Sequence, residues 1–378
     1  MQSEHAELYT STTLEAPATE VDYLEAEKRF DELMRMDGLD EQVRFRPKAA
    51  RHFESALGEA LDAAFDRELD GCAAAHLFLQ RVLYRINRLK FFWYDELTNY
   101  DNERSDYLRA VRERIESAWQ AWELAQLDVE ALRREDVSAA LKSRAALDVS
   151  PSPSPSGIYF RDEVGEAGYK RLLAIVSLDG LVEASQLSRT LGGVSNEIHA
   201  VMTRLLVEEY GGGRLNRKHS TFFTAMLTEL GMSAEPEGYF DLVPWEVLAA
   251  INQSFLLSER KRFYLRYVGG LLYTEISVPA AFDNYRAAAE RLGMPEAARG
   301  YWELHIREDE RHGRWMLEDV ALPLAERYAS EAWEIVLGYD QQKFMSDRAG
   351  AAIERAARAA ETEASASSLT RDVREVGA

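Results

Sequence analysis

Cysteine is almost absent from this chain, which has one such residue, Cys72, among 378. A single thiol forms no intramolecular disulfide and builds no metal site that needs several thiolates. Proteins of reducing compartments show this cysteine usage. We therefore expect a cytoplasmic protein whose fold does not depend on disulfides.

Positive charge is also in deficit, because 45 Lys and Arg residues face 65 Asp and Glu residues, a formal charge of −20. Such a surface repels phosphates, so we expect neither nucleic acid nor an anionic membrane as a partner. No run of about 18 apolar residues is present to span a bilayer. Residues 1–19 lack the basic and apolar parts of a signal peptide, and none is expected.

Patterns typical of β-strands are missing too, since no period-two alternation or hairpin turn signal occurs. Apolar residues instead recur every three or four positions, as at Leu79, Val82, Ile86 and Leu89. Glycines follow several of the predicted helices, as Gly231 does, where they end a helix most easily. The sequence therefore predicts an all-α fold.

An alternating Pro-Ser run at 150–157 cannot continue a helix and prefers an extended backbone, so we interpret it as a domain boundary. The predicted order is a disordered lead-in (1–20), an N-terminal helical domain (21–150), the Pro/Ser linker (151–157), a second helical domain (158–346) and a C-terminal tail that frays (347–378). Within the second domain we expect separate helices at 260–275 and 279–292, with Pro279 in a first turn.

Histidine is scarce, with seven residues in all, and this makes the spacing of His305, Asp309 and His312 informative. In a helix these positions, four and three residues apart, project from one stripe and can converge on one or two ions. Two imidazoles and a carboxylate suit iron. The neighbouring charged residues also fit a solvated helix face, so the stripe alone leaves both interpretations open.

Other candidate ligands lie in apolar surroundings. Glu275 follows the apolar segment Tyr267–Tyr273, where an unpaired carboxylate is costly to bury; a surface glutamate at a helix end is the alternative. Glu183 lies among leucines, with Asp179 one turn earlier as its rival.

The segment around residue 210 adds two more candidates. Either Glu208 or Glu209 can turn inward at the end of a predicted helix. His219 follows a glycine-rich loop and opens an apolar stretch, although a capping or surface role also fits.

A ferritin-like di-iron protein would require Glu-x-x-His motifs on two helices. Only Asp309-Glu310-Arg311-His312 approximates one, because Glu197-Ile198-His199 has the wrong offset. The ferritin-like bundle is therefore disfavoured, and another helical scaffold for iron is needed.

The spacing His305-x3-Asp309-x2-His312, Glu275 in Tyr273-Thr274-Glu275, and the earlier Glu183 and His219 resemble the heme-oxygenase-like di-iron oxidases and oxygenases. The resemblance covers about residues 159–345. It implies a seven-helix bundle of the heme-oxygenase type that binds two iron ions, uses O₂ as co-substrate and contains no heme.

The placement of Glu209 ahead of His219 resembles the N-oxygenating branch of that family, which has an additional carboxylate ligand there and a helical N-terminal dimerisation domain. The resemblance implies a homodimer formed through residues 21–150, and catalytic roles for Glu209 and Asp309. The metal ligands it implies are Glu183, Glu209, His219, Glu275, His305, Asp309 and His312. One member of the branch carries a C-terminal cupin; no β-rich or His-rich segment follows Met345 here, so the cupin's rearrangement step is not implied.

The expected function is that of a non-heme di-iron N-oxygenase in natural-product biosynthesis. It would oxidise an amine, guanidino or aminoimidazole nitrogen of a small molecule to a hydroxylamine, nitroso or nitro product, with an external electron donor. Three alternatives stay open: an oxidase of the same family that desaturates or cleaves a C–C bond of an amino or fatty acid, heme binding on the same fold, and a helical dimer without catalysis.

Aromatic residues near the proposed ligands are candidates for substrate binding. We predict that Tyr210, Phe222, Tyr273 and Trp302 line the substrate pocket. At helical spacing such residues also fit the core of a bundle.

Overall fold

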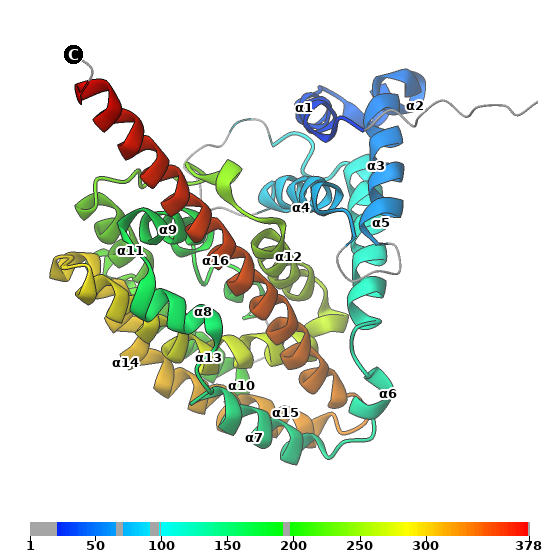
Figure 1. Ribbon diagram of the computed structural model, residues 1–378. Helices are drawn as coiled ribbons and strands as arrows, with labels where there is room; N and C mark the ends of the chain where they lie inside the picture. The colour runs from blue at the N-terminus through cyan, green and yellow to red at the C-terminus, as the bar shows by residue number, and fades with distance from the viewer. Residues whose placement is uncertain (1–20, 66–70, 91–97, 99, 192–196, 377–378) are drawn as a thin grey trace, which may run out of the picture.

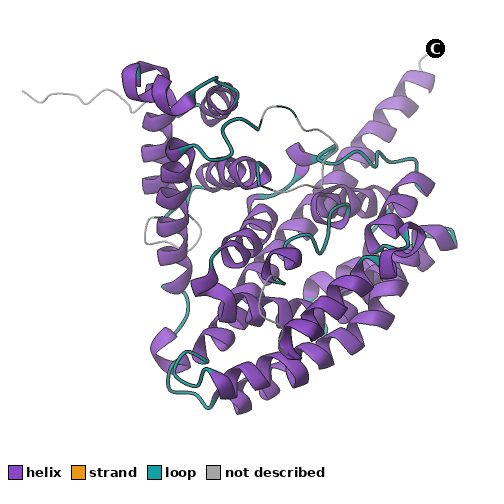
Figure 2. Cartoon of the chain, turned by 180° about the vertical axis from the view of Figure 1, so that it is seen from behind, coloured by secondary structure: helices purple, strands orange, loops and turns teal. Residues whose placement is uncertain are grey.

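The computed structural model describes residues 21–65, 71–90, 98, 100–191 and 197–376; the predicted lead-in at 1–20 lies outside them. The described residues form helices and no strand (Figures 1 and 2), which confirms the all-α prediction. None of these helices is both long enough and apolar enough to cross a membrane.

The first half of the chain contains short amphipathic helices around an aromatic core. Ser105 accepts a hydrogen bond from the Leu108 amide and so caps one of them, α5. Phe30, Phe53 and Phe78 are buried between three others. The helices are α1 (Tyr23–Met34), α2 (Leu39–Phe45), α3 (Arg51–Ala64), α4 (Ala73–Arg88), α5 (Asp106–Leu124), α6 (Val129–Leu132) and α7 (Val137–Asp148).

The second half is a bundle of longer helices built around α13 and α16, which cross each other (Figure 1). A short π-helix, η9 (Met316–Ala321), continues directly from α14. The helices are α8 (Pro155–Ile158), α9 (Glu166–Gly180), α10 (Glu197–Glu209), α11 (His219–Glu229), α12 (Trp245–Glu259), α13 (Tyr264–Arg291), α14 (Gly300–Trp315), α15 (Leu322–Arg327) and α16 (Trp333–Val376).

The predicted break near Pro279 is wrong, because α13 runs through that residue as one helix. Proline removes the hydrogen bond that its own amide would donate to the carbonyl of Glu275, four residues earlier. Gly313 of α14 packs against this carbonyl, where a Cβ would lie 3.1 Å from the oxygen. The close approach of α14 puts Glu275 beside the ligand stripe instead of at a helix end.

The linker and the tail are also more helical than expected. Ser154 accepts a hydrogen bond from the Gly157 amide at 3.0 Å and caps α8, which Pro155 begins, so the last part of the 151–157 run is a helical turn. The segment 347–376 continues α16, because Ala349, Ile353 and Ala357 bury one face of that helix in the core.

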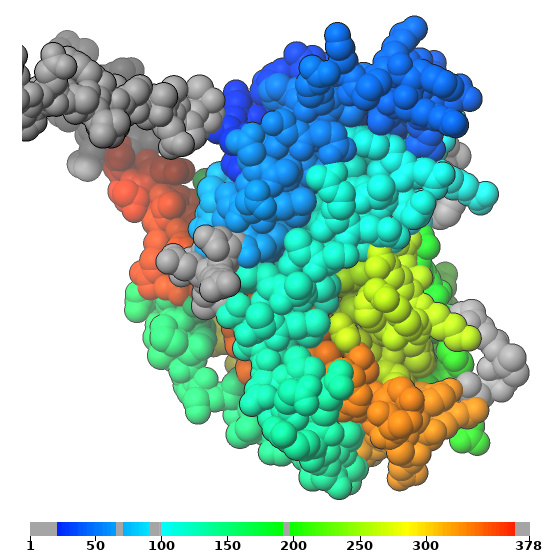
Figure 3. Space-filling model, turned by 90° about the vertical axis from the view of Figure 1, so that its right-hand side faces the viewer, coloured from blue at the N-terminus to red at the C-terminus, as the bar shows by residue number. Residues whose placement is uncertain are grey.

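The helices on the two sides of the 151–157 run share one apolar core. In this core Trp122 of α5 contacts Trp245 of α12 and Phe344 of α16, while His76 of α4 stacks on Trp245 at 4.1 Å. In Figure 3 the cyan part of the N-terminal segment lies against the yellow-green segment near residue 260. The predicted N-terminal domain is therefore packed tightly on the second one.

Candidate metal centre

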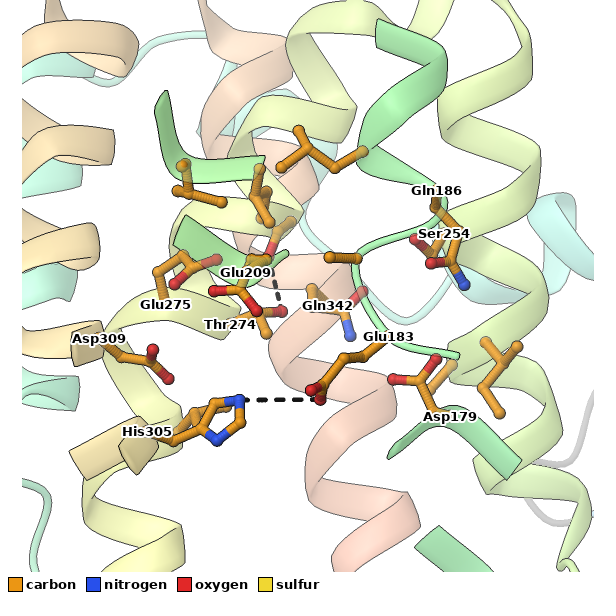
Figure 4. Close-up of a pocket in the computed structure, with 18 of the residues that line it drawn as sticks. Asp179, Glu183, Gln186, Glu209, Ser254, Thr274, Glu275, His305, Asp309 and Gln342 are labelled. Carbon is orange, nitrogen blue, oxygen red and sulfur yellow. Dashed lines mark hydrogen bonds and ion pairs between the residues drawn. The ribbon is translucent and has the colours of Figure 1, made fainter. Parts of the chain in front are cut away.

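All seven predicted ligands converge at one place inside the second helical region. Figure 4 labels five of them: Glu183, Glu209, Glu275, His305 and Asp309. Helix α14 supplies His305, Asp309 and His312 from one face, as their spacing predicts, and all three are buried. Four other elements supply one residue each: the turn after α9, the end of α10, the start of α11 and the middle of α13.

Glu183 lies in the turn that follows α9 and not within a helix. Helix α9 ends at Gly180, and Ala184 has a left-handed backbone with a φ of 63°. A residue with a Cβ rarely adopts this conformation, which is typical of functional segments. The turn aims the carboxylate of Glu183 at His305, with Oε2 3.7 Å from Nε2.

The first donor group contains Glu183, Glu209, His219 and His305, whose ligand atoms lie within 4.8 Å of one another. His219 Nδ1 is 2.8 Å from Glu209 Oε2 and 3.1 Å from His305 Nε2. Two imidazole nitrogens and two carboxylates therefore face one point, a donor set that suits a divalent metal ion.

The second donor group contains Glu209, Asp309 and His312. His312 Nδ1 is 3.4 Å from Glu209 Oε1 and 3.5 Å from Asp309 Oδ1. Glu275 adds Oε2 at 3.3 Å from the same nitrogen. Glu209 belongs to both groups, because one carboxylate oxygen faces His219 and the other faces His312.

The carboxylates of this cluster cannot all ionise easily in the absence of a cation. Burial raises the pKa of Glu183, Glu275 and Asp309, and the negative charge of Glu209 adds to the effect. Burial also opposes the ionisation of Glu209, but the contacts with His219 and His312 outweigh it and lower its pKa.

Burial lowers the pKa of His305 to about 4, and its neighbour His219 acts in the same direction. A neutral imidazole is the form that binds a metal, so this environment suits a ligand. His312 behaves differently: burial opposes its protonation, but Asp309, Glu209 and Glu275 outweigh it and raise its pKa.

Three buried polar atoms of the cluster have no hydrogen-bond partner, and this shows that the cluster fits a metal. Glu183 Oε1, Asp309 Oδ1 and His312 Nδ1 are buried and make no hydrogen bond. Buried polar atoms without partners are rare, and a cation held between these oxygens and nitrogens would satisfy all three.

Two neighbouring groups orient the ligands, and the sequence had not identified them in this role. His305 Nδ1 lies 2.9 Å from the carbonyl oxygen of Tyr301, one helical turn earlier, so Nε2 faces the cluster. The Tyr301 hydroxyl donates a hydrogen bond to Glu183 Oε2. The four-residue offset between Tyr301 and His305 is a signal that could have predicted the first contact.

The cluster borders a cavity of about 260 Å³. Five carboxylates line it, and no lysine or arginine of the described residues does so. Asp179 opens onto this cavity without belonging to either donor group (Figure 4). Phe282 and Tyr301 supply aromatic surface. The carboxylates are Asp179, Glu183, Glu209, Glu275 and Asp309.

The four aromatic residues predicted to bind substrate do not line this cavity. The Trp302 indole donates a hydrogen bond to the Tyr169 hydroxyl at 2.7 Å, inside the core. Tyr273 packs edge-on against Tyr339, Phe222 packs at the edge of the core, and Lys218 covers the ring of Tyr210. Helical spacing does not distinguish a core aromatic from a pocket aromatic, which is why these predictions are not supported.

The fold and the donor set define a helical domain able to bind a metal through histidines and carboxylates. Residues 170–341 match the family of iron-containing redox enzymes. The predicted family resemblance is thereby confirmed.

A segment of 168 residues is 27% identical to nitrosourea synthase of Streptomyces achromogenes subsp. streptozoticus. It covers 44% of this chain and 36% of that relative. The chain therefore matches about a third of the length of this relative.

Proposed function

We propose that this protein is an O₂-dependent non-heme di-iron N-oxygenase that oxidises a basic nitrogen of a small molecule. The observation that carries the proposal is the pair of donor groups joined by Glu209. Two positions that share a carboxylate support a count of two iron ions, and the likeness to nitrosourea synthase supports nitrogen as the oxidised atom.

The chain's own residues would hold the metal and exclude water. Glu183, Glu209, His219 and His305 would bind one ion, and Asp309, His312 and Glu275, with the second oxygen of Glu209, the other. Ferrous ions bound there would supply electrons to O₂. In each cycle one oxygen atom is added to the nitrogen and the other leaves as water, while an external donor provides two electrons and two protons.

The charge of the cavity supports a cationic substrate. Asp179 opens onto the cavity beside four other carboxylates, and this concentration of negative charge favours a cation in the space between them. An amine, a guanidine or a 2-aminoimidazole supplies one. A fatty acid would add a further negative charge to a cavity lined by carboxylates, which disfavours that alternative.

Iron loading followed by oxygenation tests the proposal. Metal-free protein is titrated anaerobically with Fe(II), and we expect two ions per chain and no Soret band. Exposure to ¹⁸O₂ with a reductant and a panel of arginine-type, lysine-type and 2-aminoimidazole compounds should give a nitrogen-oxygenated product that carries the label, detected by mass spectrometry.

Variants on one helix provide the matched comparison. His305→Ala should lose iron and product, whereas Glu310→Gln, a solvent-exposed position on α14, should keep both. The proposed site is wrong if His305→Ala still binds two ions and forms product. Oxidation of carbon alone across the panel would favour the oxidase alternative.

A further inference from the structure

We infer that Glu208 is a positioning residue for His312: it holds the imidazole through Nε2, so that Nδ1 is the atom presented to the metal. The inference rests on the proposed metal centre and deepens it. Glu208 is not in either donor group that faces the cavity, and it lies on the opposite side of the His312 ring.

The geometry around His312 is the first argument. The residue is fully buried, and its Nε2 is 3.0 Å from Glu208 Oε2, a hydrogen-bond distance. Its Nδ1 makes no hydrogen bond and faces the carboxylates of Glu209, Glu275 and Asp309. A ring whose Nε2 donates a proton to Glu208 has its Nδ1 lone pair free for a metal.

The end of α10 brackets the ring from two sides. Glu208 and Glu209 are consecutive, yet one approaches Nε2 and the other lies 3.4 Å from Nδ1. Successive side chains point in different directions around a helix, so neighbouring carboxylates can flank one imidazole. The register of α10 therefore places both the predicted ligand Glu209 and the residue Glu208, which orients the ligand His312.

Glu208 is itself held in place from outside the cluster. Arg311 Nη2 donates to Glu208 Oε2 at 2.5 Å, and Arg204 Nε lies 3.5 Å from Oε1. Both guanidinium groups lie over the ring of Trp315, at 3.7 Å for Arg204 and 5.1 Å for Arg311. These contacts hold the Glu208 carboxylate in place, and the carboxylate in turn orients the His312 ring.

A hydrogen bond from a ligand imidazole to a carboxylate fixes the tautomer and the ring orientation and makes the ligand nitrogen more basic. Loss of such a partner typically weakens metal binding about 10- to 100-fold. We expect Glu208 to act in this way on the metal position bound by His312, and not on the position bound by His219 and His305.

A third metal ion is the competing explanation, because Glu208, Glu308 and His312 also bring ligand atoms within 4.8 Å of one another. Arg311 Nη2 contacts the carboxylates of both glutamates. The guanidinium thus already supplies the positive charge that a third ion would bring, which favours the positioning role.

The test measures Fe(II) affinity by anaerobic titration of the full chain. Glu208→Ala should weaken one of the two binding steps about 10- to 100-fold, and Glu208→Gln, which keeps an acceptor oxygen, should recover part of that loss. Glu308→Gln is the matched control, since it removes a partner of Arg311 without contacting Nε2, and it should bind iron within about twofold of the parent.

A double-variant cycle separates positioning from a structural effect. In a His312→Ala background, Glu208→Ala should change neither binding step further, and the visible spectrum of Co(II)-loaded protein should change in the parent background only. Equal losses in both backgrounds, or three ions bound per chain, would overturn the inference. A parent protein that binds no iron contradicts the proposed function itself, whereas a parent that binds two ions and is unaffected by Glu208→Ala contradicts only this inference.

Discussion

Asp179 is the cavity residue that most directly tests the charge of the substrate, because it faces the cavity without belonging to a donor group. We expect Asp179→Asn to raise KM for a cationic substrate about 10- to 100-fold, the usual worth of a charged hydrogen bond. Iron stoichiometry should stay at the parent value, and steady-state kinetics with anaerobic titration measure both.

Asp283→Asn on the solvent side of α13 is the matched control and should leave KM unchanged. If Asp179→Asn loses iron instead, Asp179 is a ligand, the alternative that the sequence left open beside Glu183. An unchanged KM for every cationic compound would remove the argument for a cationic substrate.

The buried carboxyl of Glu123 in α5, which lies outside the metal centre, should make the stability of the protein depend on pH. Burial raises its pKa to about 8, although Gln120 and Gln341 oppose the shift. The neutral carboxyl therefore stabilises the fold fully below its unfolded pKa near 4.5, and this contribution is lost as the pH rises through about 8.

The substitution Glu123→Gln removes the ionisable group, so the variant does not lose stability in this way as the pH rises. Relative to the parent, the variant should gain about 1.4 kcal/mol in the free energy of unfolding for each pH unit between those limits. Urea denaturation of metal-free protein at pH 6 and pH 7.5 measures the difference. The exposed Glu113→Gln is the control for loss of one charge, and a pH-independent difference for Glu123→Gln would contradict the prediction.

At the scale of elements, the crossing of α13 and α16 depends on two glycines. A Cβ at Gly338 would lie 1.9 Å from the Arg266 carbonyl oxygen, and one at Gly269 would lie 1.9 Å from that of Ile335. These contacts involve backbone atoms that cannot move aside, so the helices can approach this closely only where both residues lack side chains.

We therefore expect Gly338→Ala to destabilise the protein by about 3 kcal/mol or more, through overpacking at the crossing. Gly350→Ala on the same helix meets nothing within 4 Å and should be neutral or stabilising by up to about 1 kcal/mol. Chemical denaturation compares the two variants. Equal stabilities would show that α13 and α16 cross less closely than described.

At the scale of the whole molecule, the helices before and after the 151–157 run stabilise each other. Asn87 of α4 donates to Asn252 of α12 at 3.1 Å, and Asn252 donates back to the Gln80 carbonyl at 2.9 Å. These buried amides lie in the same interface as the cluster around Trp122 and Trp245. Separating the two parts would expose both polar and apolar surface.

We expect the fragment 158–378 alone to aggregate or to unfold without a cooperative transition, because the faces of α12 and α16 that cover Trp122 would meet water. Calorimetry and light scattering compare it with the full chain. A monomeric fragment that melts cooperatively and binds iron would contradict this. Dimerisation through the N-terminal helices stays a prediction.

The periodicity of the sequence was sufficient for the all-helical fold and for the stripe of His305, Asp309 and His312, because helical spacing alone puts these side chains on one face. The resemblance to a known family added the four remaining ligands, which are Glu183, Glu209, His219 and Glu275. These are local relations along the chain, which a sequence pattern records directly.

Only the tertiary structure decided which atoms face each other. In the structure, α13 continues through Pro279, and Glu183 points toward His305 from a turn outside any helix. Asp179 lines the cavity, whereas the four aromatic residues predicted to bind substrate do not. Each outcome depends on how separate helices pack: the close approach of α14 at Gly313, the turn at Ala184 and the register of α10. Contacts between distant segments fix these features, and no single helix contains that information.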